Sequence, residues 1–403
     1  MGVFSRTKNK NELVLVFDIG SGKVGGSLFM MQDSGIPKII FTAVEQIPAE
    51  KNFNIDRFLS LTIQSLESVA ERVYSSGLGV PKGIFCILSS PWHISQTRII
   101  NFQKNTPFIF TAKLAESLVQ KEINIFEQEH SIKSADNNNF NRIIELKNIK
   151  TILNGYETPE PLNKKTKELE ITIFVSMSEE QVLKKIEDTV GKFFHHKQIK
   201  FSSFELSSFA VARDVFIKQD NFLLVDIGGE VTNISMVKKN ILRESVTFPI
   251  GFNFLTRGVA SNLGCTLAEA SSMISLFEAG HAEEAVAKKV SLLMDQTKIG
   301  WLKSFQDSLA NISNDISIPS TIYLTTDDEF ADFFTRTIKA EQFNQYTLTE
   351  SKFEITFLNT EILHNFAAFK GGAIRDPNLI IDSIYVNRFL IDSFRSKLLE
   401  KAK

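Results

Sequence analysis

The sequence predicts an α/β protein made of two related domains, with a smaller α/β subdomain inserted into the first. A strand, a glycine-rich turn and a second strand occur around Asp18, and the same pattern recurs around Asp226, 208 residues later. Strands and helices alternate through the rest of the chain, which is typical of α/β architecture. A duplication at this spacing indicates two domains of common design.

Length and composition fit this class. The 403 residues suffice for two large domains, and 43% hydrophobic with 23% charged residues is ordinary for a soluble protein. A net charge of -2 provides no basic field, so we expect no nucleic-acid partner. The two cysteines, Cys86 and Cys265, have no metal-binding spacing and are expected to be reduced. Without a signal peptide or a long apolar run, a cytoplasmic location is expected.

The first domain opens with strands. Apolar runs predict strands over 13–17, 27–31 and 38–44, and apolar residues at helical spacing predict a helix over 56–76. Another strand is predicted over 83–88. We assign residues 12–104 to the first part of this domain.

The inserted subdomain is assigned to residues 105–200. It comprises a helix over 113–129, strands over 142–146, near 151–153 and over 168–177, and a helix over 179–194. The strand 171–175 and the helix 182–190 are expected to share one small core, so that the subdomain could be deleted on its own.

The second domain follows a connecting helix assigned to residues 201–220. Strands are predicted over 222–225, 231–237, 321–324 and 353–358, and helices over 266–279, 283–312 and 328–340. We assign residues 221–373 to this domain, with a late return to the first, and residues 374–403 to a helical tail.

The two glycine-rich turns carry the candidate chemistry. The first runs Asp18-Ile-Gly-Ser-Gly-Lys23 and the second Asp226-Ile-Gly-Gly-Glu-Val-Thr232. Glycines allow backbone N–H groups to approach phosphate oxygens, and an Asp at the end of a strand can hold hydrated Mg²⁺. Either turn alone could simply close a hairpin, whereas two facing turns could bind a β- and a γ-phosphate.

The pair of turns resembles the phosphate-1 and phosphate-2 loops of the actin, sugar-kinase and chaperone ATPase superfamily. Within it, the stretch 204–210 resembles the start of the connecting helix of FtsA proteins, and the run 248–256 with 263–270 resembles both FtsA and PilM proteins. The predicted insertion also stands where those proteins carry their own. The resemblance extends from about residue 12 to 373 and implies an actin-like fold, duplicated on the ribonuclease-H pattern.

The resemblance also implies site residues. ATP or ADP with Mg²⁺ would be held by the loops, with Asp18 and Asp226 positioning the metal through water. Glu205 and Asp226 are the residues implied in catalysis, and Glu205 would orient the attacking water. A surface or capping role is the alternative for Glu205, and solvation on the turn is the alternative for Lys23. The residues implied to bind the cofactor are Asp18, Gly20, Ser21, Gly22, Lys23, Asp226, Gly228, Gly229 and Thr232.

The purine side of the site departs from the pattern. FtsA-like proteins carry a Gly-Gly turn after a late strand, where this chain has Thr325-Thr-Asp-Asp328. Ile274 replaces an expected Lys, and Asn233 replaces an Asp after the second loop. We therefore expect side chains, including those of two acidic residues, where a purine would lie. The sequence leaves open whether the protein hydrolyses ATP.

The resemblance implies an FtsA-like scaffold or membrane adaptor in cell division, which binds itself as a dimer or filament and a tubulin-like division protein. The alternatives are a PilM-like component of type IV pilus assembly, a small-molecule kinase and a nucleotide-free scaffold. A kinase would need an intact nucleoside site and a catalytic Asp in the first domain, and we find neither.

The C-terminal segment has two interpretations. Ile384, Ile391, Phe394 and Leu398 recur at helical spacing among basic residues, which is typical of a helix that lies on the inner face of a membrane. The alternative, which we prefer, is a helix that packs on the second domain.

Overall fold

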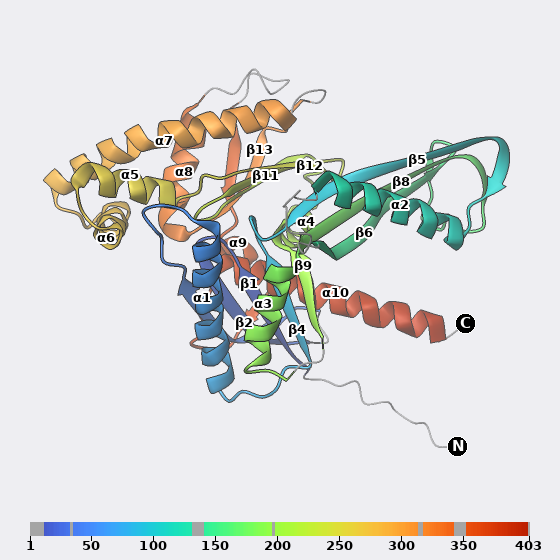
Figure 1. Ribbon diagram of the computed structural model, residues 1–403, viewed down its shortest axis with the longest axis horizontal. Coiled ribbons are helices and arrows are strands. Elements are labelled where there is room, and N and C mark those ends of the chain that lie inside the picture. The colour runs from blue at the N-terminus through green and yellow to red at the C-terminus, as the bar shows by residue number, and fades with distance from the viewer. Residues whose placement is uncertain are drawn as a thin grey trace.

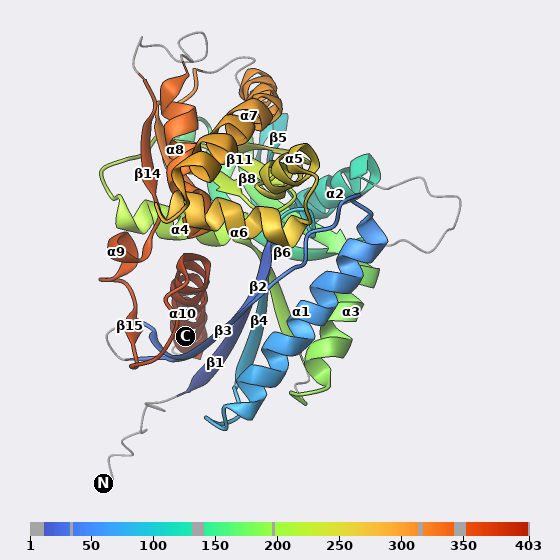
Figure 2. The same cartoon turned by 90° about the vertical axis from the view of Figure 1, so that its left-hand side faces the viewer.

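The computed structural model describes residues 12–32, 35–130, 141–195, 198–312, 317–341 and 352–401; for 391–401 it describes the backbone only. Three sheets organise these residues (Figures 1 and 2). The first has six strands in the order β15-β3-β2-β1-β4-β9, the second has five in the order β12-β11-β10-β13-β14, and the third has four in the order β5-β8-β6-β7.

The first sheet comprises β1 (Leu13–Ile19), β2 (Lys23–Met30), β3 (Lys38–Gln46), β4 (Gly83–Leu88), β9 (Ile199–Ser203) and β15 (Ala368–Phe369). Helices α1 (Ile55–Ser75) and α3 (Glu180–Gly191) cover one face and contribute to a core that includes Phe17, Leu66 and Leu183. Asn54 begins α1 because its side chain accepts the Arg57 N–H at 2.9 Å.

The second sheet comprises β10 (Phe222–Ile227), β11 (Thr232–Lys238), β12 (Ile241–Phe248), β13 (Thr321–Thr326) and β14 (Glu354–Phe357). One face packs in a core with α5 (Asn253–Leu263), α6 (Leu267–Glu278), α7 (Glu284–Ile312) and α8 (Asp328–Ala340). Thr266 and Glu269 form a capping box that begins α6, and Gly264, at φ 66°, ends α5 in the left-handed conformation.

The two large sheets share a central core. It includes residues of α4 (Phe204–Val215) and α10 (Pro377–Lys401) together with strands from both sheets and α9 (Thr360–Leu363). The α10 helix therefore packs with α4 against the first sheet, and not on the second domain alone as expected. Ile384, the first member of the predicted membrane stripe, is buried in this core; the others lie among residues whose side chains are not described.

The third sheet forms the inserted subdomain, which projects from the body (Figure 1). It comprises β5 (Ile94–Ile109), β6 (Asn141–Leu153), β7 (Tyr156–Glu157) and β8 (Lys165–Glu179), with α2 (Ala112–His130) packed on it. The expected shared core of residues 171–175 and 182–190 is wrong, because α3 packs with α1 on the first sheet. These contacts favour boundaries for the insertion near 94 and 179 instead of 105 and 200, a division that remains our proposal.

Candidate functional site: the cleft between the two domains

The two glycine-rich loops occupy equivalent positions in the two large sheets. Each joins two antiparallel strands, β1 to β2 and β10 to β11, and Asp18 and Asp226 pair across these hairpins with Gly25 and Asn233. Each turn is closed by the same bond, from Gly20 N to Lys23 O at 3.1 Å and from Gly228 N to Val231 O at 2.9 Å. The duplication predicted from the sequence is therefore present in the backbone.

The loops pack directly against each other. The Glu230 N–H donates to Ser21 Oγ at 3.3 Å, and a Cβ on Gly229 would lie 2.5 Å from Ser21 O and 2.7 Å from Gly22 Cα. The Phe252 ring also packs closely on Gly22, where a Cβ would collide with its Cζ. The space between the loops is about 20 Å³, which admits about one water-sized group. The two loops therefore contact each other where facing loops would hold phosphates.

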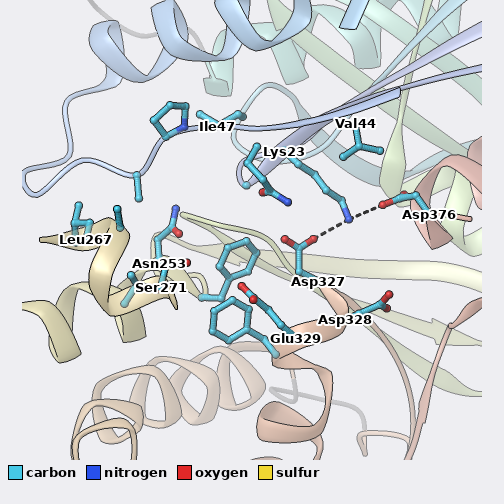
Figure 3. Close-up of a pocket in the computed structure, with 18 of the residues that line it drawn as sticks. Lys23, Val44, Ile47, Asn253, Leu267, Ser271, Asp327, Asp328, Glu329 and Asp376 are labelled. Carbon is cyan, nitrogen blue, oxygen red and sulfur yellow. Dashed lines mark ion pairs between the residues drawn. The ribbon is translucent and has the colours of Figure 1, made fainter. Parts of the chain in front are cut away.

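Lys23 is held by two carboxylates instead of facing an open site. Its Nζ lies 2.7 Å from Asp327 Oδ1 and 2.7 Å from Asp376 Oδ2 (Figure 3). Asp327 lies between β13 and α8, and Asp376 is the residue before α10. Burial disfavours the charged ammonium, but Asp376 and Asp327 together raise the pKa of Lys23 above its ordinary value. The expectation that Lys23 is solvated on its turn is wrong.

The two predicted metal-binding carboxylates are buried. Burial and the nearby Asp376 raise the pKa of Asp18 to about 8, so its carboxyl group is largely protonated at neutral pH. Burial raises the pKa of Asp226 to about 6, although the Thr325 hydroxyl donates to it at 2.8 Å. Among the described residues, no group of three or more His, Cys, Asp or Glu side chains converges to hold a metal ion.

Glu205 lies in the first turn of α4 and is 4% exposed. Its carboxylate accepts hydrogen bonds from three hydroxyls: from Ser235 at 2.8 Å, and from Ser95 and Ser245. These serines come from β11, β5 and β12, so Glu205 joins the first domain, the insertion and the second domain. Both oxygens of Glu205 accept hydrogen bonds from these serines, so its side chain links the three parts of the fold, and the surface or capping role is wrong.

Other predicted residues divide into two sets. The inner space is lined by Asp18, Gly20, Ser21, Gly22, Lys23, Asp226 and Gly228, and Gly229 contacts it through the facing loop. Thr232 lies apart from these, because its hydroxyl donates to Ile250 O at 2.7 Å and accepts from Trp301 Nε1 at 3.0 Å. Ile274 is fully buried in the second core.

Sequence reasoning missed two residues at the cleft. Arg257 binds both carboxylate oxygens of Glu230, at 2.6 and 2.8 Å, and donates to Glu50 O of the first domain at 2.7 Å. His93 is buried beside Glu205, and burial lowers the pKa of this imidazole. Glu230, in the second glycine-rich turn, could have indicated a basic partner such as Arg257, since a buried carboxylate needs one.

The outer part of the cleft is a larger cavity of about 640 Å³. The expected acids, Asp327 and Asp328, line this cavity instead of filling it, together with Glu329 and Asp376. The rings of Phe252 and Phe330 stack in its wall with centroids 4.8 Å apart. The outer cavity, where the sequence places the purine side of a nucleotide site, is therefore open, and four acidic residues line it.

Comparisons with known proteins bear on the fold. Neither protein-family models nor curated proteins give a match to the sequence. A structure titled PilM-PilN type IV pilus biogenesis complex is similar over 93% of this chain and 96% of that chain, with a TM-score of 0.59 and 12% identity. EutJ from Carboxydothermus hydrogenoformans is similar over 96% of this chain and 92% of its own, with a TM-score of 0.41 and 10% identity.

At 12% identity the likeness to the PilM-PilN structure concerns the fold alone, and it confirms the fold class that the sequence predicts. A Bacteroides thetaiotaomicron protein described as having an actin-like ATPase fold is also similar, over 96% of this chain and 99% of that one, at a TM-score of 0.39 and 9% identity. The two large sheets with their duplicated hairpin loops, and the third sheet that projects from them, are arranged as in the PilM-PilN structure, at a TM-score of 0.59.

Proposed function

We propose that this protein is a PilM-like scaffold in which the actin-like body works without nucleotide and binds a partner protein. The observation that carries this proposal is the direct contact between the two loops, which leaves about 20 Å³ between them. Lys23 and Glu205, which would face a nucleotide in an ATPase of this fold, are engaged with side chains of the protein itself.

The likeness to PilM, which is named in complex with PilN, favours a role in type IV pilus assembly over the division role. An FtsA-like role in cell division is the second candidate, because the stretches 248–256 and 263–270 resemble both proteins. In either role the protein would act at the inner face of the membrane through its partners and through self-association. No helix in the described part of the chain is both long and apolar enough to cross a membrane.

A groove between the insertion and the first sheet supports binding of a partner. It has a volume of about 400 Å³ and lies between β6 and β9, with Phe85, Tyr385 and Phe389 among its lining residues. Within the described residues, β9 is an edge strand, and β7 pairs with β6 only at Ile152 and Leu153. Both strands can therefore accept an extended partner segment by main-chain hydrogen bonding.

The charges of the groove indicate the chemistry of such a segment. Lys147 and Lys200 lie over the Phe389 ring, 4.2 and 5.6 Å from its centroid, whereas Arg142, which also lines the groove, is paired with Glu180 and Glu187. Basic groups around aromatic rings suit a partner segment that combines apolar and acidic side chains.

The nucleotide-independent part is tested by calorimetric titration of the full chain with Mg-ATP and with Mg-ADP. We expect no binding heat at millimolar nucleotide. Micromolar affinity for either would refute this part, because the loops would then have to open readily.

The partner-binding part of the proposal is tested with proteins encoded by neighbouring genes. If those genes belong to a pilus cluster the PilM-like role is favoured, and if they belong to a division cluster the FtsA-like role is favoured. Co-purification with such a product should be lost in Lys147→Glu with Lys200→Glu and retained in the control, Lys303→Glu with Lys339→Glu, whose residues are exposed on α7 and α8. Equal retention by both variants would remove the groove from the proposal.

A further inference from the structure

The outer cleft carries an excess of acidic groups. Among its lining residues, Asp327, Asp328, Glu329 and Asp376 are acidic, whereas Lys23 and Arg375 are basic. Lys23 is neutralised by Asp327 and Asp376, and the Arg375 guanidinium lies over the Phe369 ring, 5.1 Å from its centroid. One ammonium between two carboxylates still leaves a net negative charge, and Asp328 and Glu329 add to it, so the cavity repels phosphates and attracts cations.

The inner end of the same cleft provides an independent indication of a ligand. Asp18 is 1% exposed and Thr326 is 6% exposed, and both line the 20 Å³ space between the loops. No hydrogen bond of ordinary geometry reaches either Asp18 oxygen or the Thr326 hydroxyl from the described residues, although the Asn378 side chain is near enough to Asp18 to lower its pKa somewhat. Buried polar groups normally have partners, so the oxygens of these two groups have unused capacity to accept a hydrogen bond.

The two spaces adjoin, since Gly22, Lys23, Phe252 and Asp327 line both. The inner one admits a single water-sized group, which is the size of a primary ammonium. The outer one is of small-ligand size and offers the stacked Phe252 and Phe330 rings, with Ile47, Pro48 and Leu267, as an apolar wall.

From this arrangement we infer that the cleft binds an aliphatic polyamine. One terminal ammonium donates to Asp18 and Thr326 between the loops, the methylene chain lies along the aromatic wall, and a second ammonium meets Asp328 and Glu329. A metal ion fits less well, because a hard cation needs several oxygens converging on one point and the described carboxylates do not converge. The inference goes beyond the scaffold role and does not depend on it.

The test is calorimetric titration of the full chain with spermidine and with putrescine at physiological ionic strength, with MgCl₂ as an inorganic control. We expect spermidine to bind and Mg²⁺ not to compete at equal concentration. The double variant Asp328→Asn with Glu329→Gln should weaken spermidine binding at least about tenfold. The control variant Glu283→Gln with Glu284→Gln removes the same charge at the exposed start of α7 and should bind as wild type.

A second variant guards against loss of helix α8, whose first turn contains Asp328 and Glu329. Ala268→Arg leaves every acidic residue in place and puts a guanidinium into the cavity from an exposed position on α6. It should abolish spermidine binding while circular dichroism stays unchanged.

Three outcomes would overturn the inference: no spermidine binding by wild type, equal affinity in the double variant and its control, or full competition by Mg²⁺, which would indicate attraction to surface charge only. If the wild type binds spermidine and, in the separate titration, also binds Mg-ATP, the nucleotide-free function is refuted but the polyamine site is not. The two proposals therefore fail separately.

Discussion

Asp18→Asn is expected to stabilise the protein, by an amount that grows with pH. The Asp18 carboxyl group is buried without a hydrogen bond of ordinary geometry from the described residues, and its pKa is raised from 3.8 to about 8. Asn has nearly the shape of the protonated acid but cannot ionise. The variant therefore removes the free-energy cost of placing a carboxylate at this position.

The sign and size follow from proton linkage. Between pH 4 and 8 the native state retains the Asp18 proton that the unfolded chain loses, so the wild-type free energy of unfolding falls as pH rises. Each pH unit in this window is worth about 1.4 kcal/mol. The advantage of Asp18→Asn should thus increase by about 4 kcal/mol between about pH 5 and 8 and level off above the folded pKa.

Urea denaturation at a series of pH values, followed by tryptophan fluorescence, measures this difference. Trp92 is a suitable probe because its Nε1 donates to Gly20 O at 3.2 Å, next to the loop in question. Asp188→Asn, at an exposed position on α3, is the control and should give a curve parallel to that of wild type. A difference between Asp18→Asn and wild type that stays flat with pH would refute the reasoning, as would a less stable variant.

Three further predictions concern the contact between the two loops, the ion pairs of Lys23 and the packing of α10. Gly229→Ala should lower stability on the order of 1–3 kcal/mol, because its Cβ would lie 2.5 Å from Ser21 O. The control Gly191→Ala, at the end of helix α3 with nothing within 4 Å, should leave the melting temperature unchanged or raise it slightly, and a loss as large as that of Gly229→Ala would contradict the loop contact. Lys23→Met should lower the free energy of unfolding by about 3–5 kcal/mol, since Asp327 and Asp376 lose their cation, and urea curves like those of wild type would rule out the ion pairs. Truncation after Ser383 removes the buried Val386 and Asn387 and should lower the melting temperature without changing liposome sedimentation; the opposite result would make α10 a membrane anchor.

The hairpins around the two loops were predictable because their signals are local. Apolar runs on both sides of a glycine turn specify a hairpin, and the same signal occurs twice in this chain. Helices α6, α7 and α8 were predicted within about a residue of their ends, since caps and apolar spacing lie within each segment. Strand β5 was missed because ten of its sixteen residues are exposed, so that it lacks a sustained alternation of apolar residues.

The contacts that close the cleft were not predictable because they join residues far apart in the chain. Glu205 meets Ser95, 110 residues earlier, and its other two serines belong to the second domain. Nothing in the sequence around Lys23 indicates that Asp376 will neutralise it. The same holds for α3, whose apolar face suits either neighbouring sheet, so that its place on the first sheet is decided by the fold alone.

The glycine motifs have two physical explanations, and only one involves phosphate. A glycine in such a loop lets backbone approach a phosphate, but it equally lets backbone approach the facing loop, which is what Gly229 does against Ser21 and Gly22. The motif therefore predicts close approach without saying what is approached. The partners of the neighbouring charges distinguish the two cases: a lysine free to meet phosphate indicates a nucleotide site, whereas Lys23, held by Asp327 and Asp376, indicates a cleft that closes on itself.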